Sequence, residues 1–203
     1  IGVIGIAIGT VLLPEMSRRI TAGDAGGAAA SQRRAFEFSL LATVPFVAAF
    51  LTVPDVIMRA LFARGAFTKG DAAAAAVTLA AYAIGLIPFV TIRSAGSAFY
   101  ARKDTATTVK ASLTGLAVNV LLKVVLMGSL AQVGLALATA TGAWINLLLV
   151  LGFSVRSGYL DFDRGLLRSL GKFAVSGLVL AAALWFAARL AAAQFAHLGT
   201  LRD

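Results

Sequence analysis

Few residues in this sequence could form or break covalent bonds. It contains no cysteine, one histidine (His197) and nine Asp and Glu residues, so thiolate metal sites and cysteine nucleophiles are excluded and metal ligands are scarce. Asp161 and Asp163 lie beside Arg164, where we expect a solvated charge cluster. No HExxH, GxSxG or Walker A motif occurs. The sequence therefore predicts no enzyme, no metal site and no cofactor.

Lys123 is the residue best placed by type to act on a charged ligand. It lies within a long apolar run, and Asn119 precedes it by four residues, on the same helical face. An ionised lysine at the bilayer centre costs about 2.5–3.5 kcal/mol, so such residues usually face a protein interior or a wet cavity. Either Lys123 and Asn119 line a hydrophilic pathway that attracts an anion, or the lysine stem carries its ammonium to the nearby membrane surface.

Two arginines and two prolines are further candidates. Arg93 ends one apolar segment and Arg18 follows another; each faces a cavity mouth or, alternatively, meets lipid headgroups. Pro45 and Pro88 lie inside apolar segments, where proline frees a backbone carbonyl and bends the helix. They are candidate hinges, with inert kinks as the alternative. The GxxxG pair at 5–9 permits close helix packing.

The composition indicates what must position these residues. Hydrophobic residues make up 60% of the 203-residue chain and charged residues 13%, and the mean hydropathy is +0.90. Soluble domains have about 45–50% apolar and about 25% charged residues, so both values indicate a polytopic membrane protein. The formal net charge is +9. In such a chain, basic residues belong to cytoplasmic loops and anionic headgroups, so we expect no nucleic acid partner.

Uncharged stretches of about 20 residues predict membrane-spanning helices. The first stretch is short and begins inside an apolar run, so we expect a piece of a longer chain. The run from Val124 to Val155 is too long for one helix, and Gly128, Ser129 and Gln132 offer a turn within it. The predicted segments are 1–14, which is partial, and 38–54, 72–92, 108–129, 131–153 and 173–193.

Basic residues are concentrated in alternate loops. The first, third and fifth loops carry most of the Lys and Arg residues, which places these loops in the cytoplasm. Segments 17–36 and 93–110 mix cations with apolar residues, and we expect short interfacial helices there. The basic residues of the three loops are Arg18, Arg19, Arg33, Arg34, Arg93, Arg102, Lys103, Lys110, Arg156, Arg164, Arg168 and Lys172.

Three motifs resemble those of one family. LPEMSR at 13–18 resembles an "LPxxS" turn, LFARGAFT at 61–68 with Asp71 resembles an "RGxFT…D" loop, and AFYARKDT at 98–105 resembles an "FYAxxDT" segment. The motifs occur in the family's order and at its spacing relative to the helices. Over nearly its whole length, the chain therefore resembles the MurJ/MviN family of lipid II flippases.

The resemblance implies an all-α, polytopic transmembrane helix bundle with the MOP/MATE-like flippase fold. That fold has two pseudo-symmetric bundles of six helices around a central cavity, followed by further C-terminal helices. The chain would match the end of helix 8 and helices 9 to 13, which is about five full spans and part of another. Residues 1–153 would be part of the second bundle, and 154–203 a cytoplasmic loop, an additional transmembrane helix and a tail. The other bundle carries most arginines that the family uses on the substrate pyrophosphate.

The implied function is transport of lipid II, the undecaprenyl-pyrophosphate-linked disaccharide-pentapeptide. It would cross from the inner to the outer leaflet of the bacterial cytoplasmic (inner) membrane by alternating access during cell-wall synthesis. Lipid II, membrane lipids and cell-wall synthesis proteins would be the partners. The alternatives are export of another lipid-linked oligosaccharide, MATE-like antiport, which usually needs a central intramembrane acid, and a non-transporting cell-wall scaffold.

Overall fold

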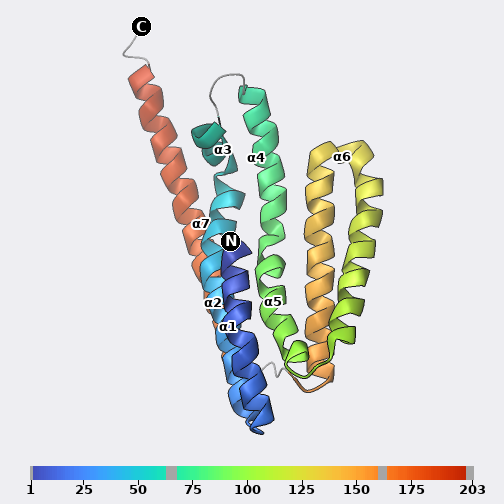
Figure 1. Ribbon diagram of the computed structural model, residues 1–203. Coiled ribbons are helices and arrows are strands. Elements are labelled where there is room, and N and C mark those ends of the chain that lie inside the picture. Colours follow the sequence, from blue (N-terminus) through green and yellow to red (C-terminus); the bar gives the residue numbers. More distant parts are fainter. Residues whose placement is uncertain (1, 63–67, 160–163, 200–203) are drawn as a thin grey trace.

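Long apolar stretches without strand-like alternation form helices throughout the described part of the chain. The computed structural model describes residues 2–62, 68–159 and 164–199 (Figure 1). The helices are α1 (Gly2–Thr21), α2 (Ala25–Thr52), α3 (Pro54–Phe62), α4 (Lys69–Ile84), α5 (Leu86–Tyr100), α6 (Thr105–Arg156) and α7 (Arg164–Gly199). The all-α fold expected from the sequence is confirmed.

Four helical segments are long and apolar enough to cross a membrane, as judged by length and composition. They are Ala25–Thr52, Gly70–Tyr100, Thr105–Arg156 and Gly165–Ala193. The third reverses direction at Ala131, whose φ of 46° and ψ of −126° interrupt the helix, so that α6 is a hairpin of two antiparallel arms (Figure 1). The predicted helices 108–129 and 131–153 therefore both exist.

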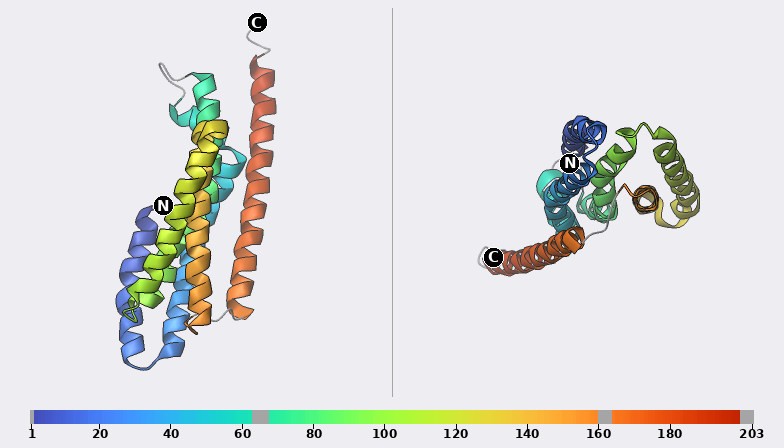
Figure 2. Two further views of the ribbon diagram at one scale, coloured as in Figure 1. Left: turned by 90° about the vertical axis from the view of Figure 1, so that its right-hand side faces the viewer. Right: turned by 90° about the horizontal axis from the view of Figure 1, so that it is seen from below.

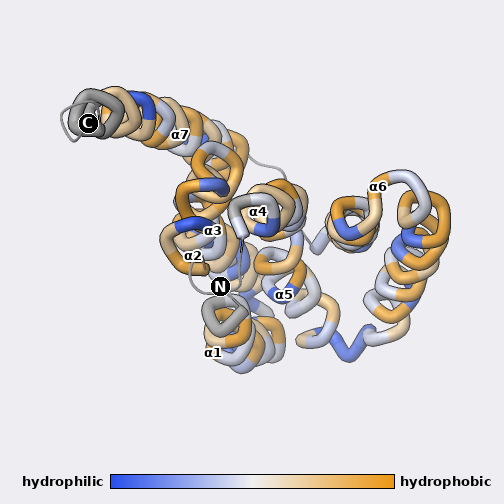
Figure 3. The backbone as a smooth tube through the Cα atoms, turned by 90° about the horizontal axis from the view of Figure 1, so that it is seen from above, coloured by the Kyte–Doolittle hydropathy of each residue, from blue (hydrophilic) through white to orange (hydrophobic). Residues whose placement is uncertain are grey.

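Helix α5 lies at the centre of the bundle. It contacts α1 and α2 on one side and α6 on the other, and α4 also contacts α6. Two further views show α6 and α7 on different sides of the group formed by α1, α2, α4 and α5 (Figures 2 and 3). Helix α7 packs along α2, and Leu166, near its start, belongs to a buried cluster that also contains residues of α5 and α6. Figure 3 shows hydrophobic residues along every helix.

Small polar residues form the contact between α2 and α5. Ser39 and Ser94 are fully buried, and their hydroxyl oxygens lie 3.3 Å apart. Gln32 is also fully buried, and its side-chain amide donates to the Ser94 carbonyl at 3.4 Å. Small hydroxyl side chains let helices approach closely in an apolar medium and supply hydrogen bonds between them. This contact fixes α5 against α2 and leaves the other faces of α5 to α1 and α6.

The prediction of short interfacial helices at 17–36 and 93–110 is wrong. Helix α1 continues to Thr21 and α2 begins at Ala25 after a tight turn, in which Gly23 has φ 76° and Asp24 caps α2 by accepting from Gly27 N–H. Helix α5 likewise continues to Tyr100. Left-handed and capping residues can reverse a chain within a few positions, so no residues remain for a separate helix in the membrane plane.

Two of the three motifs contain the residue that caps the start of a helix, and the first motif lies within a helix. Pro14 lies inside α1, so the first motif is helical and is not the turn that the sequence suggested. In the second motif, residues 63–67 lie outside the described part, but Thr68 and Asp71 form a capping box that starts α4. In the third, Asp104 caps α6 by accepting from Thr107 N–H at 3.2 Å.

The predicted span 72–92 differs from the structure in two ways. The helical segment extends to Tyr100, and it is divided at Gly85 into α4 and α5. Pro88 explains the division, because a proline lacks the N–H that would bond to the carbonyl four residues earlier. Pro45, in contrast, is contained in the single helix α2.

Candidate functional site

A groove lined by both polar and apolar side chains follows α5 between α1 and α6. It consists of two adjoining cavities with volumes of about 490 Å³ and about 170 Å³. The larger is lined by α1, α5 and α6, and the smaller by α5 and both arms of α6. Phe89, Ile92, Ser112 and Asn146 line both cavities. We call these two cavities together the α5 groove.

Two glycine–asparagine pairs shape the smaller cavity. Gly115 and Asn119 lie four residues apart on the first arm of α6, and Gly142 and Asn146 repeat the spacing on the second. A Cβ added at Gly115 would lie 2.9 Å from Asn146 Cβ, and one added at Gly142 would lie 2.7 Å from Asn119 Cβ. Each glycine thus makes room for the asparagine of the other arm.

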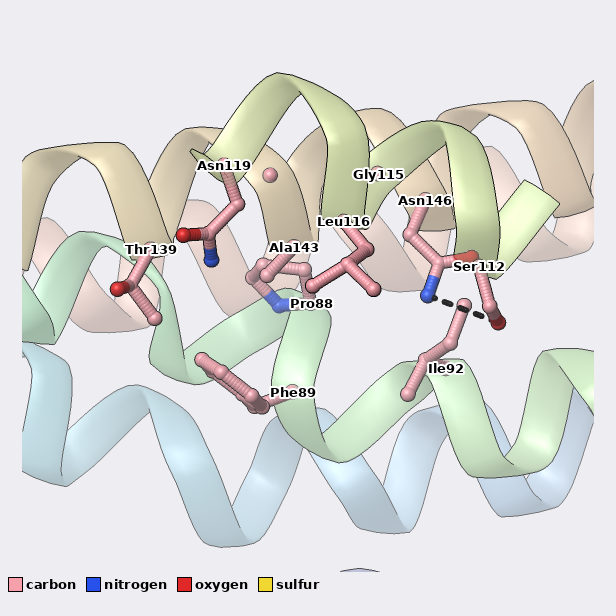
Figure 4. A pocket seen from close by; sticks show the side chains of 11 residues that line it. Pro88, Phe89, Ile92, Ser112, Gly115, Leu116, Asn119, Thr139, Ala143 and Asn146 are labelled. Carbon is pink, nitrogen blue, oxygen red and sulfur yellow. Dashed lines mark hydrogen bonds between the residues drawn. The ribbon is translucent and has the colours of Figure 1, made fainter. Parts of the chain in front are cut away.

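The two asparagine side chains reach the cavity with free acceptors. Figure 4 shows Asn119 and Asn146 toward opposite ends of the cavity, with Leu116 and Pro88 between them. Asn146 Nδ2 donates to Ser112 Oγ at 3.4 Å. The Oδ1 atoms of both asparagines are buried without a hydrogen-bond partner among the described residues. Buried acceptors without partners are costly, so these oxygens are suited to a hydroxyl or N–H donor from a ligand.

Arg93 brings a positive charge to the larger cavity. Its stem passes α1 where Gly5 and Gly9 leave space: a Cβ at Gly5 would lie 3.3 Å from Arg93 Cδ, and one at Gly9 would lie 3.7 Å from Arg93 Cβ. The GxxxG pair therefore makes room for an arginine stem. Arg93 lines the cavity with the hydroxyl residues Thr10 and Ser97.

The Arg93 guanidinium has no hydrogen bond or ion pair within the described part of the chain. Its five N–H donors form a planar fork that matches phosphate oxygens. The α5 groove thus combines a free guanidinium, two free carboxamide oxygens and several hydroxyl groups. Such a set is suited to a ligand that carries both phosphate and hydroxyl groups.

The other predicted residues lie elsewhere. Lys123 is half-buried, one turn beyond Asn119 on the first arm of α6, and lines neither cavity of the groove. Arg18 is at the end of α1, with 78% of its side chain exposed, and pairs with Glu15 at 2.8 Å. The structure therefore brings Arg93 and Asn119 to one groove and leaves Lys123 and Arg18 outside it.

The two predicted hinge residues differ in their relation to the groove. Pro88 lines the smaller cavity, immediately after the break at Gly85. Pro45 lies in α2, which lines neither cavity.

Several groove residues were missed by sequence reasoning. Ser112 and Asn146 join the two cavities, and Thr139 lines the smaller one. The repeated GxxxN spacing at 115–119 and 142–146 was a usable signal, because it places a small residue and a carboxamide on one face of each arm. Single serine and threonine residues gave no such signal, since they are common in membrane helices.

The groove does not offer the usual protein ligands of a transition metal. Among the described residues, no group of three or more His, Cys, Asp and Glu side chains lies close enough to hold an ion.

The matching family model and the similar curated proteins that we compared name the same family. The family model described as "Lipid II flippase MurJ" matches residues 1–201. The chain is 38% identical over 187 residues to a probable lipid II flippase MurJ of Rhizobium meliloti (strain 1021), which covers 92% of this chain and 35% of that protein. It is 36% identical over 180 residues to the probable lipid II flippase MurJ of Rhizobium tropici, which covers 89% and 34%.

A further relative is the lipid II flippase MurJ of Burkholderia cenocepacia. It is 31% identical over 179 residues, covering 88% of this chain and 34% of that protein. The chain thus spans about a third of the length of the curated relatives that it matches.

Proposed function

The chain belongs to the lipid II flippase MurJ family, and we propose that it forms part of a protein that moves lipid II across the bacterial cytoplasmic membrane. It is a multi-pass membrane protein. The observation that carries the proposal is the α5 groove, in which Arg93 and the carboxamides of Asn119 and Asn146 are free to bind a ligand. The protein transports its substrate and makes or breaks no bond in it.

The groove lowers the barrier to crossing by replacing water around a polar headgroup. Lipid II carries a pyrophosphate, a disaccharide and a peptide. Transfer of such groups from water into hydrocarbon without hydrogen-bond partners costs several kcal/mol. Arg93 binds the pyrophosphate, because its fork forms charge-assisted hydrogen bonds with phosphate oxygens. Asn119 and Asn146 accept from sugar hydroxyls or peptide N–H groups. The polyprenyl tail stays in the bilayer.

The chain corresponds to part of the second helix bundle of the family fold. Residues 1–153 supply one wall of the central cavity, and 154–203 supply a cytoplasmic connection and an additional transmembrane helix. The other bundle supplies the opposite wall, and the two bundles open alternately to each side of the membrane. The exposure of Arg93 at the groove supports this arrangement, since a charged side chain needs a protein or aqueous neighbour within the membrane.

The proposal is tested in the full-length protein by replacing Arg93. Depleting the host's own protein while measuring lipid II on each leaflet gives the baseline, and wild type restores outer-leaflet lipid II. We expect Arg93→Ala to lower flipping about tenfold or more, as the loss of a charge-assisted hydrogen bond gives, and Arg93→Lys to retain part of the activity.

Arg189→Ala is the matched control, because Arg189 lies on α7 and contacts Trp185, away from the groove. It should flip lipid II normally. Normal outer-leaflet lipid II after depletion would refute the transport proposal. If the Arg93→Ala variant flipped lipid II as well as the wild type, the α5 groove would not be the substrate-binding site.

A further inference from the structure

The joint between α4 and α5 contains a broken hydrogen-bond ladder. Pro88 has no N–H, so it cannot donate to the carbonyl of Ile84, four residues earlier. The Gly85 N–H turns to the Tyr82 carbonyl at 3.0 Å, a tighter three-residue bond. A backbone carbonyl without a donor is expensive inside a membrane, so the Ile84 oxygen needs a partner from elsewhere.

Trp144 supplies that partner. Its indole Nε1 donates to the Ile84 carbonyl at 2.9 Å, across 60 residues of sequence. The indole has this one donor and no acceptor. The bond therefore connects the second arm of α6 to the backbone position that Pro88 leaves open.

A second contact, one helical turn away, fixes the same joint. A Cβ added at Gly85 would lie 3.0 Å from Ala140 Cα, so the glycine backbone packs directly on α6. Ala140 and Trp144 are four residues apart and thus lie on one face of the second arm. Together they hold the α4–α5 joint from one side.

The orientation of α5 determines where the groove residues lie. Phe89, Ile92 and Arg93 follow the joint directly and line the groove, whereas α4 precedes the joint and lines neither of its cavities. A change of angle at Gly85 would move these side chains relative to Asn119 and Asn146 on α6. The hydrogen bond between Trp144 and Ile84 acts on that angle, because it bridges α6 and the last residue of α4.

We propose that Trp144 is a positioning residue: its indole N–H completes the ladder broken by Pro88 and sets the α4–α5 angle that holds Arg93 in the groove. The predicted effect of Trp144 on transport rests on the proposed function, whereas its predicted effect on the α4–α5 angle does not.

The test is a double-substitution cycle in the full-length protein. Trp144→Phe keeps an aromatic ring and removes the donor, whereas Pro88→Ala restores a backbone N–H that can reach the Ile84 carbonyl. Spin labels at Val77 on α4 and at Lys103, in the turn directly after α5, report the joint geometry as a distance distribution. Both positions are exposed and line neither cavity of the groove. Reconstituted vesicles containing lipid II report the flipping rate.

We expect Trp144→Phe to broaden the distance distribution and to lower flipping about fivefold, the factor that one ordinary hydrogen bond gives. Adding Pro88→Ala should restore the distance distribution, because the Ile84 carbonyl regains a donor. Since Pro88 itself lines the groove, flipping is compared only between the wild type and Trp144→Phe. Trp185→Phe is the control: Trp185 is the other of the chain's two tryptophans, lies on α7 and is 52% exposed, so neither readout should change.

If Trp144→Phe fails to fold, the same measurement is made with benzothienylalanine at position 144, because this analogue keeps the indole shape and lacks only the N–H. An unchanged distribution in that variant, or a Trp144→Phe broadening of the distribution that Pro88→Ala does not reverse, would overturn the inference. If the wild type flips no lipid II, the proposed function fails, and the distance distributions alone decide the role of Trp144.

Discussion

Glu15, Arg19 and Asp24 form a chain of ion pairs where α1 turns into α2. Arg19 Nε lies 2.6 Å from Glu15 Oε1, and Arg19 Nη1 lies 3.0 Å from Asp24 Oδ2. The Arg19 side chain donates to Glu15 and, with the nearby positive charges, lowers the pKa of that carboxyl below its ordinary value of 4.5. Since Asp24 also caps α2, these pairs connect the end of one helix to the start of the next.

Acid should loosen this turn. The pKa of Glu15 is lower in the folded chain than in the unfolded one, so its stabilising effect is complete above pH 4.5 and is lost as the pH falls through the lower folded value. Glu15→Gln should remove this dependence. This pH dependence is measured by hydrogen exchange of amides 22–28, compared between the wild type and the variant at each pH from 3 to 7. Parallel protection profiles for the two proteins would contradict the prediction.

At the scale of the helix, the α6 hairpin depends on two close approaches between its arms. A Cβ at Gly115 would lie 2.7 Å from the Gly142 carbonyl oxygen, and one at Gly142 would lie 2.7 Å from the Gly115 oxygen. Small residues are the usual means of close packing in membranes, where the hydrophobic effect does not drive helices together. These glycines therefore set the spacing that brings Asn119 and Asn146 to the same cavity.

Replacing one of these glycines should separate the arms. Gly115→Ala places a methyl group against backbone, and overpacking of this kind costs about 1–3 kcal/mol. We expect a lower unfolding temperature of the full-length protein in detergent, together with weaker flipping. Gly128→Ala is the matched control on the same arm, because nothing lies within 4 Å of its Cβ. Equal unfolding temperatures for the two variants would rule out the close approach as a source of stability.

At the scale of the whole molecule, alternate connections lie at the same end of the bundle. The α1–α2 turn, the α5–α6 turn and the end of α6 lie together, and the α6 hairpin tip lies at the other end (Figure 1). The first group contains the basic residues Arg18, Arg19, Arg102 and Arg156. Because basic loops remain in the cytoplasm, this end should face inward.

Cysteine labelling checks the orientation, and the chain has no cysteine of its own. In an otherwise cysteine-free full-length protein, Ser129→Cys at the hairpin tip should react with an impermeant maleimide added to intact cells. Ser157→Cys, after the end of α6, should react only once the membrane is permeabilised. The reverse pattern would show that the assigned orientation is wrong.

Much of the helical layout could be predicted from the sequence. Apolar stretches of membrane-spanning length identify the helices, and the gap between 129 and 131 locates the α6 reversal to within a residue or two. The role of Gly5 and Gly9 in close packing was also predicted, though not the arginine stem that they accommodate. The expected interfacial helices were wrong, because composition alone does not reveal a glycine or aspartate turn that lets both neighbouring helices continue.

The sequence by itself determined that the chain is a helical membrane protein and that Asn119 and Arg93 are unusual residues within it. Hydropathy and charge patterns repeat over one or two helical turns, so residues that are close in the sequence are enough to identify them. Only the tertiary structure decided that Asn119 meets Gly142, that Arg93 passes Gly5 and that Trp144 completes the backbone at Ile84. These contacts join residues 23, 88 and 60 positions apart. Which residues meet depends on which faces of the helices pack together, and local sequence patterns do not determine that.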